Sequence, residues 1–190
     1  MKIFGIGANR TGTTSLTEAL KILGFRSTSD WSHHQEMAKL LIRNRFDFPF
    51  LEEIDCIADL PIPSIYPELD REFPGSKFIL TLRDVQSWLV SQRRHHARVH
   101  GPVFENALLY GVWRFDAEIF ERRYQEHNER AMKYFAERPH DFLVLDICAG
   151  EGWDKLCPFL GVPPPDVAFP VTSQLANVAH GEEEAWGTRW

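Results

Sequence analysis

The sequence is poor in cysteine and lacks the cysteine spacings that bind metals. Its three cysteines, Cys56, Cys148 and Cys157, form no CxxC pair in a chain of 190 residues. An odd number without such a pair disfavours a disulfide framework or a zinc site. We therefore expect reduced thiols, packed as small buried side chains, in a cytoplasmic protein.

Long apolar runs and an excess of basic residues are also absent. No stretch approaches the ~18 apolar residues of a membrane helix, and residues 1–7 are too short for a signal-peptide core. The chain has 27 acidic against 21 basic side chains and a formal charge of −6. This balance disfavours a general binder of nucleic acid or of an anionic membrane, so we expect neither as a partner.

No repeat, low-complexity tract or Gly/Ser-rich linker divides the chain, which predicts a single domain over residues 1–190. With 44% hydrophobic residues the composition is that of a globular protein. A chain of this length buries roughly 70% of the surface that it exposes when unfolded. A core can therefore form without disulfides or a structural metal.

Apolar runs alternate with helical patterns along the chain. Strands are predicted at residues 2–7, 54–58, 76–82 and 142–146, and helices at 14–23, 32–43, 84–98, 103–138 and 153–160. Most of the strand segments are apolar throughout, which is typical of a parallel sheet with both faces covered. The sequence thus predicts an α/β fold, whose ligands bind beyond the carboxyl ends of the strands.

The most informative segment is the glycine loop GANRTGTTS at residues 7–15, between the first strand and the first helix. Unpaired amides and the helix dipole make such a junction a binding site for anions. A loop that binds nucleoside triphosphates has lysine after its second glycine, where this chain has Thr13. The cation lies inside the loop instead, at Arg10, whose guanidinium suits a phosphate or a sulfate.

The loop resembles that of the sulfotransferases that use 3′-phosphoadenosine 5′-phosphosulfate (PAPS). A second resemblance is Arg83 at the end of a strand, with Ser91 eight positions later; in that family such a pair holds the 3′-phosphate. The resemblance implies a P-loop three-layer sandwich with a mostly parallel central sheet flanked by helices. It also implies cofactor contacts from Arg10, Thr11, Gly12, Thr13, Thr14, Ser15, Arg83 and Ser91.

The segment at residues 58–61 resembles the place where the family carries its catalytic histidine or glutamate. Asp59 stands there, 24 residues before Arg83. Asp59 is the candidate general base, and Arg10 is the candidate for stabilising charge in the reaction. Aspartate is a weak base unless burial favours its protonated form, and His33 and His34 are the competing candidates. The resemblance covers residues 3–170; the Arg-Lys-Gly element that many cytosolic members use is absent, so the adenine contacts are unassigned.

The resemblance implies in-line transfer of a sulfuryl group from PAPS to a hydroxyl or amine of a small-molecule or carbohydrate acceptor. It requires no metal, because the donor lacks the β,γ-phosphate bridge that magnesium neutralises in kinases. Two alternatives are a P-loop kinase of a small metabolite and a non-catalytic anion-binding module. The segment 143–152 also resembles a methyltransferase glycine motif, but only 38 residues follow it, too few for the rest of that domain.

A cluster of basic side chains ends the helix predicted at 84–98. Such charges are favourable near a helix C-terminus without any ligand, which is the preferred interpretation, and an anionic acceptor is the alternative. The cluster consists of Arg93, Arg94, His95, His96, Arg98 and His100.

Overall fold

The computed structural model describes residues 1–28, 31–43, 45–46, 48–99, 101 and 103–172. Its centre is a five-stranded sheet in the order β2-β3-β1-β4-β5, and every pairing is parallel. The predicted α/β architecture is therefore confirmed. The strands are β1 (Ile3–Gly5), β2 (Ser27–Thr28), β3 (Cys56–Ala58), β4 (Lys77–Thr81) and β5 (Phe142–Leu145).

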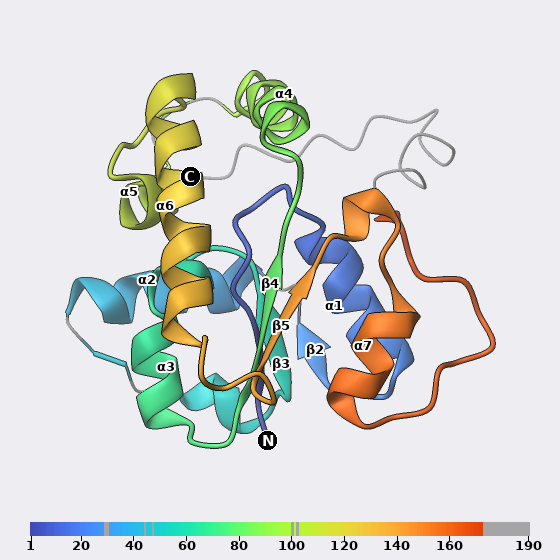
Figure 1. The fold of residues 1–190 in the computed structure, drawn as a ribbon. Coiled ribbons are helices and arrows are strands. Elements are labelled where there is room, and N and C mark those ends of the chain that lie inside the picture. The colour runs from blue at the N-terminus through green and yellow to red at the C-terminus, as the bar shows by residue number, and fades with distance from the viewer. Residues whose placement is uncertain (29–30, 44, 47, 100, 102, 173–190) are drawn as a thin grey trace.

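Helices cover both faces of the sheet (Figure 1). On one face lie α1 (Thr13–Ile22) and α7 (Trp153–Leu160); on the other lie α2 (Trp31–Ile42), α3 (Tyr66–Glu72) and α6 (Ala117–Tyr134). Two further helices, α4 (Val85–His96) and α5 (Phe104–Tyr110), lie toward the carboxyl ends of the strands (Figure 1). Short 3₁₀ turns are η1 (Pro49–Glu52), η2 (Ile62–Ser64) and η3 (Ile147–Ala149). None of the helices in the described part of the chain is both long and apolar enough to cross a membrane.

Four features differ from the expectation. The helix predicted over 103–138 is two helices, because Gly111 ends α5 in the left-handed region at φ 77° and Asp116 caps the start of α6. Strand β2 was not predicted, since two residues carry no periodic signal, and α3 was not predicted among the prolines at 61–67. Helix α2 begins at Trp31, one residue before the predicted start at residue 32.

The core is divided by the sheet. Along β4, Phe78 and Leu80 belong to the cluster under α2, α3 and α6, whereas Ile79 belongs to the cluster under α1 and α7. All three side chains have 0% exposure. Burial on both faces explains why the strands are apolar throughout.

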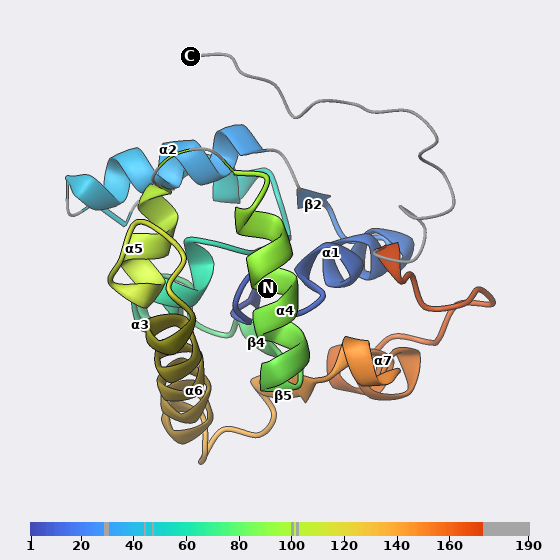
Figure 2. The ribbon, with the colours of Figure 1, turned by 90° about the horizontal axis from the view of Figure 1, so that it is seen from above.

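A third cluster lies where α4, α5 and α6 meet above the sheet (Figure 2). Trp88 of α4 stacks on Tyr124 of α6 with ring centroids 4.2 Å apart, and Tyr110 stacks on Phe120 at 3.8 Å. Aromatic packing of this kind holds α4 firmly on the rest of the domain. The ends of β1, β3 and β4 therefore lie beside a fixed helix.

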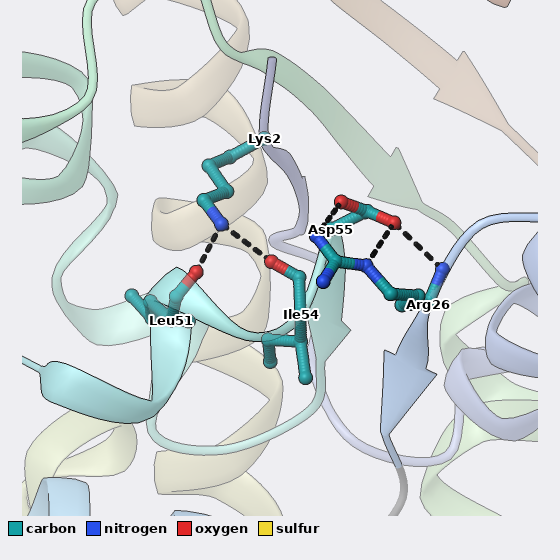
Figure 3. Close-up of polar contacts among 5 residues, drawn as sticks. All are labelled: Lys2, Arg26, Leu51, Ile54 and Asp55. Carbon is teal, nitrogen blue, oxygen red and sulfur yellow. Dashed lines mark hydrogen bonds and ion pairs between the residues drawn. The ribbon is translucent and has the colours of Figure 1, made fainter.

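At the opposite, amino-terminal edge, polar contacts tie down the ends of β1, β2 and β3 (Figure 3). Arg26 donates hydrogen bonds from its backbone amide and its guanidinium to the carboxylate of Asp55, at 2.8–3.0 Å. The Nζ of Lys2 donates to the carbonyl oxygens of Leu51 and Ile54. The contacts between Arg26 and Asp55 hold β2, which has only two residues, against β3.

Candidate active site

A cavity of about 380 Å³ opens at the carboxyl ends of the strands. This is the edge at which parallel α/β sheets bind ligands, and the volume suits a small molecule. Seven of the residues singled out from the sequence line it. They are Arg10, Gly12, Thr13, Thr14, Ser15, Asp59 and Arg83.

The floor of the cavity is the loop from β1 to α1. The first helical hydrogen bond of α1 runs from the Leu16 amide to the Gly12 carbonyl, at 2.9 Å. The amides of Thr13, Thr14 and Ser15 therefore have no helical carbonyl to bond, and they begin a helix whose dipole is positive at this end. Gly12 adopts φ 97°, which only glycine adopts without strain. Unpaired amides at the start of a helix are a common binding site for anions.

Two guanidinium groups lie at this loop, that of Arg10 within it and that of Arg83 next to it. Arg10, which is exposed, donates from Nε to the Ser91 hydroxyl at 3.2 Å. Arg83 donates from Nε to the Ser87 hydroxyl at 3.0 Å and from Nη1 to the Arg10 carbonyl at 3.3 Å. Each arginine is thus anchored through Nε to a serine of α4. Among the described residues Ser91 bonds Arg10 rather than Arg83, and Ser91 does not line the cavity.

Asp59 lies at the end of β3, facing the start of α1. Its Oδ2 accepts a hydrogen bond from the Thr13 hydroxyl at 3.0 Å, and its Oδ1 accepts one from the Leu60 amide at 2.8 Å. Among the described residues, Asp59 (φ 80°) and Arg10 (φ 69°) are the two non-glycine residues with positive φ. Strained backbone of this kind is concentrated at functional sites.

Two predicted loop residues make structural contacts. Thr11 has 0% exposure, and its hydroxyl bonds the Ala8 carbonyl and the Thr81 hydroxyl, both at 2.6 Å. Only its backbone is therefore left for a ligand. The Ser15 hydroxyl bonds Thr172, at 3.1 Å from its hydroxyl and 3.2 Å from its amide. Ser15 thus fixes the segment that closes one side of the cavity.

A buried hydrogen-bond network supports the loop at Asn9. Its carbonyl oxygen accepts from Trp88 Nε1 at 2.9 Å and from Gln92 Nε2 at 3.1 Å. Its side-chain oxygen accepts from Gln92 at 2.7 Å and from the Tyr110 hydroxyl at 2.5 Å. Helices α4 and α5 therefore fix the residue immediately before Arg10. Sequence reasoning missed this network, because polar residues inside apolar helical faces carry no local signal.

The histidines proposed as alternative bases are not part of the cavity lining. The ring of His33 stacks on Phe50 with centroids 4.5 Å apart, and neither residue lines the cavity. The side chain of His34 lies outside the described residues. Another histidine, His95, is influenced by the charges of the site. Burial lowers its pKa, Arg10 lowers it further, and Asp59 opposes these effects.

Sequence reasoning also missed a second part of the cavity lining. Ile147, Cys148 and Gly150 follow β5, and Val171 and Thr172 lie far along the chain, yet all five line the cavity. For Ile147, Cys148 and Gly150 the available signal was their position after a predicted strand, at the edge where ligands bind. The expectation of three buried cysteines is wrong for Cys148: it is exposed in this wall, whereas Cys56 and Cys157 are buried.

Comparison with known proteins identifies the class. The model of the sulfotransferase domain family matches residues 2–119 and 106–178. The chain therefore belongs to the sulfotransferase domain family, as its loop and its fold indicate, and it is an enzyme of the sulfotransferase kind. It is similar to a protein of Aspergillus versicolor named Ava biosynthesis cluster protein M, with 28% identity over 232 aligned positions. That alignment covers 100% of this chain and 87% of the relative.

Proposed function

We propose that this protein transfers a sulfuryl group from PAPS to a hydroxyl or amine of a small-molecule or carbohydrate acceptor. The observation that carries the proposal is one cavity in which Arg10, Arg83 and the free amides of the α1 N-terminus meet a carboxylate, Asp59. Cations and amides suit the phosphate and sulfate groups of the donor. The carboxylate can take up the proton that the acceptor hydroxyl or amine loses.

The residues of the cavity fit this donor. The amides of Thr13 and Thr14 and the guanidinium of Arg10 would hold the 5′-phosphosulfate, and Arg83 would hold the 3′-phosphate. When bound, the donor supplies the sulfuryl group and departs with the electron pair of the broken S–O bond. Arg10 would stabilise the negative charge that develops on the departing oxygen. Such a transfer requires positioning and charge stabilisation, and no divalent metal.

Asp59 is the proposed proton acceptor. Each of its oxygens already accepts one hydrogen bond, from Thr13 and from Leu60, which fixes the carboxylate in one orientation. A carboxylate oxygen has a second lone pair, so it can still accept the proton of an acceptor hydroxyl. The name of the Aspergillus versicolor relative refers to a biosynthesis cluster, which supports a small-molecule acceptor.

The donor site is tested by isothermal titration calorimetry with adenosine 3′,5′-bisphosphate, without magnesium. We expect binding that weakens at least about tenfold in Arg83→Ala, since a charge-assisted contact to phosphate contributes about 1.5–3 kcal/mol. The matched control is Arg71→Ala. Arg71 lies on α3 in an exposed pair with Glu68, away from the cavity, so binding should stay unchanged.

The two alternatives predict different titrations. A small-metabolite kinase would bind ATP with magnesium and not the bisphosphate. A non-catalytic module would bind the bisphosphate and yet release no sulfate from PAPS. Absence of bisphosphate binding would therefore reject the proposed donor, whereas binding without sulfate release would reject the proposed enzymatic activity.

A further inference from the structure

One face of α4 carries the residues that hold the site. Ser87 bonds Arg83, Ser91 bonds Arg10, and Trp88 and Gln92 bond Asn9. Residues four apart lie above one another on a helix, so Ser87 and Ser91 are continued by His95 one turn further on. His95 therefore lies on the side of α4 that faces the anion-binding loop.

The surroundings of His95 differ from those of its neighbour His96. The ring of His96 packs on Phe115 and Phe120, with centroids 5.5 Å away in each case. His95 is half-buried, and neither of its ring nitrogens bonds another residue in the described part of the chain. His95 is not among the residues that line the cavity, but its ring nitrogens are unpaired in the described part of the chain and the ring lies within range of the charges of Arg10 and Asp59.

Burial and three charged groups influence the pKa of His95. Burial lowers the pKa of this imidazole, Arg10 and Arg98 lower it further, and the carboxylate of Asp59 opposes them. The adjacent ring of His96, with centroids 5.1 Å away, has its own pKa lowered to about 4 by burial and by His95. The lowered pKa favours the neutral form of each imidazole, and a neutral imidazole can accept a proton.

We propose that His95 is a second acceptor-side residue, which binds the nucleophilic hydroxyl of the acceptor and shares with Asp59 the removal of its proton. This inference rests on the proposed function. The acceptor oxygen forms the new S–O bond as the S–O bond of the donor breaks, and the electron pair of that bond leaves on the donor phosphate. The proton of the acceptor hydroxyl passes to the free ring nitrogen of His95 or to the carboxylate of Asp59.

The location of His95 is tested by NMR titration of histidine Hε1 signals in the full chain, with and without saturating adenosine 3′,5′-bisphosphate. Phosphate charge next to Arg10 should raise the titration midpoint of His95 by at least about half a pH unit. The reference is His140, whose backbone carbonyl accepts from Lys77 at the start of β4; the bisphosphate should not change its Hε1 signal. An unchanged His95 midpoint, with the bisphosphate bound in calorimetry, would overturn the proposal.

The chemical role is tested with water as the acceptor, by following sulfate release from PAPS as a function of pH. His95→Gln should slow release at least about tenfold and change the acidic limb of the profile, with bisphosphate affinity within about twofold of the parent. His140→Gln should behave as the parent. A normal rate and profile in His95→Gln would overturn the role, whereas absence of bisphosphate binding in the parent would instead reject the donor site.

Discussion

The hydroxyl of Thr13 donates a 3.0 Å hydrogen bond to Oδ2 of Asp59. Thr13 is the first residue of α1 and has 4% exposure, and Asp59 directly follows β3. This bond joins the loop at residues 7–15 to the candidate base. Thr13 occupies the position where a nucleoside-triphosphate loop has lysine, and here its hydroxyl orients the carboxylate of Asp59.

Thr13→Val is therefore expected to lower the free energy of unfolding and to slow turnover. It keeps the shape of the side chain but leaves Oδ2 of Asp59 without its donor, at a cost of about 1 kcal/mol. Thr13→Ser retains the hydroxyl and is the matched control. Urea denaturation and sulfate release from PAPS measure the two effects. Equal behaviour of the valine and serine variants would show that the bond has no consequence.

The backbone of Asp59 predicts an unusual order of stabilities. At φ 80° a residue with a β-carbon is strained by about 1–2 kcal/mol, and glycine is not. Asp59→Gly should consequently be more stable than Asp59→Ala by about 1 kcal/mol, although both lack the carboxylate and should lose turnover. Thermal unfolding of the two variants measures the difference. An alanine variant as stable as the glycine variant would contradict the strain.

Tyr110 links α5 to the loop at residues 7–15 through its 2.5 Å bond to Asn9. Complete burial raises the pKa of this phenol well above its usual value, so the hydroxyl stays protonated and donates. Tyr110→Phe should cost about 1–2 kcal/mol of stability and weaken bisphosphate binding severalfold, since the loop loses a support.

Tyr134→Phe is the control for this change. Tyr134 donates to Asp70 at 2.8 Å on the α3 side of the molecule, far from the loop. Its loss should leave the bisphosphate affinity unaltered. Calorimetry on both variants is the measurement, and an equal effect on binding would mean that the contact of Tyr110 with Asn9 does not position the loop.

The amino-terminal edge of the sheet predicts a loss of stability in acid. Hydrogen bonds from Arg26 lower the pKa of Asp55 to about 2, whereas an unfolded aspartate titrates near 3.9. The unfolded chain takes up the proton first, so this stabilisation is complete above about pH 4 and is lost as the pH falls toward about 2.

Asp55→Asn should lower the free energy of unfolding by about 1 kcal/mol at pH 7, a modest value because the pair is largely solvent-exposed. The difference between variant and parent should shrink at pH 2.5. Urea midpoints at both values test this. A difference that is independent of pH would mean that the contact with Arg26 does not lower the pKa of Asp55.

The sequence by itself determined the alternation of strands and helices, and with it the parallel sheet. It also determined the loop at residues 7–15, and it placed Arg10, Asp59 and Arg83 at strand ends on one edge. These features are local: periodicity, glycine positions and short spacings follow from neighbouring residues. They were sufficient for the resemblance to PAPS-dependent sulfotransferases, and the family was confirmed.

Tertiary structure decided which side chains meet. It paired Arg83 with Ser87 and Arg10 with Ser91, bound Asn9 to α4 and α5, and exposed Cys148 in the cavity wall. It also added β2, whose two residues are held by Arg26 and Asp55. Such contacts join segments tens of residues apart. They depend on the helix orientations that packing around the aromatic clusters imposes, and no local pattern in the sequence encodes them.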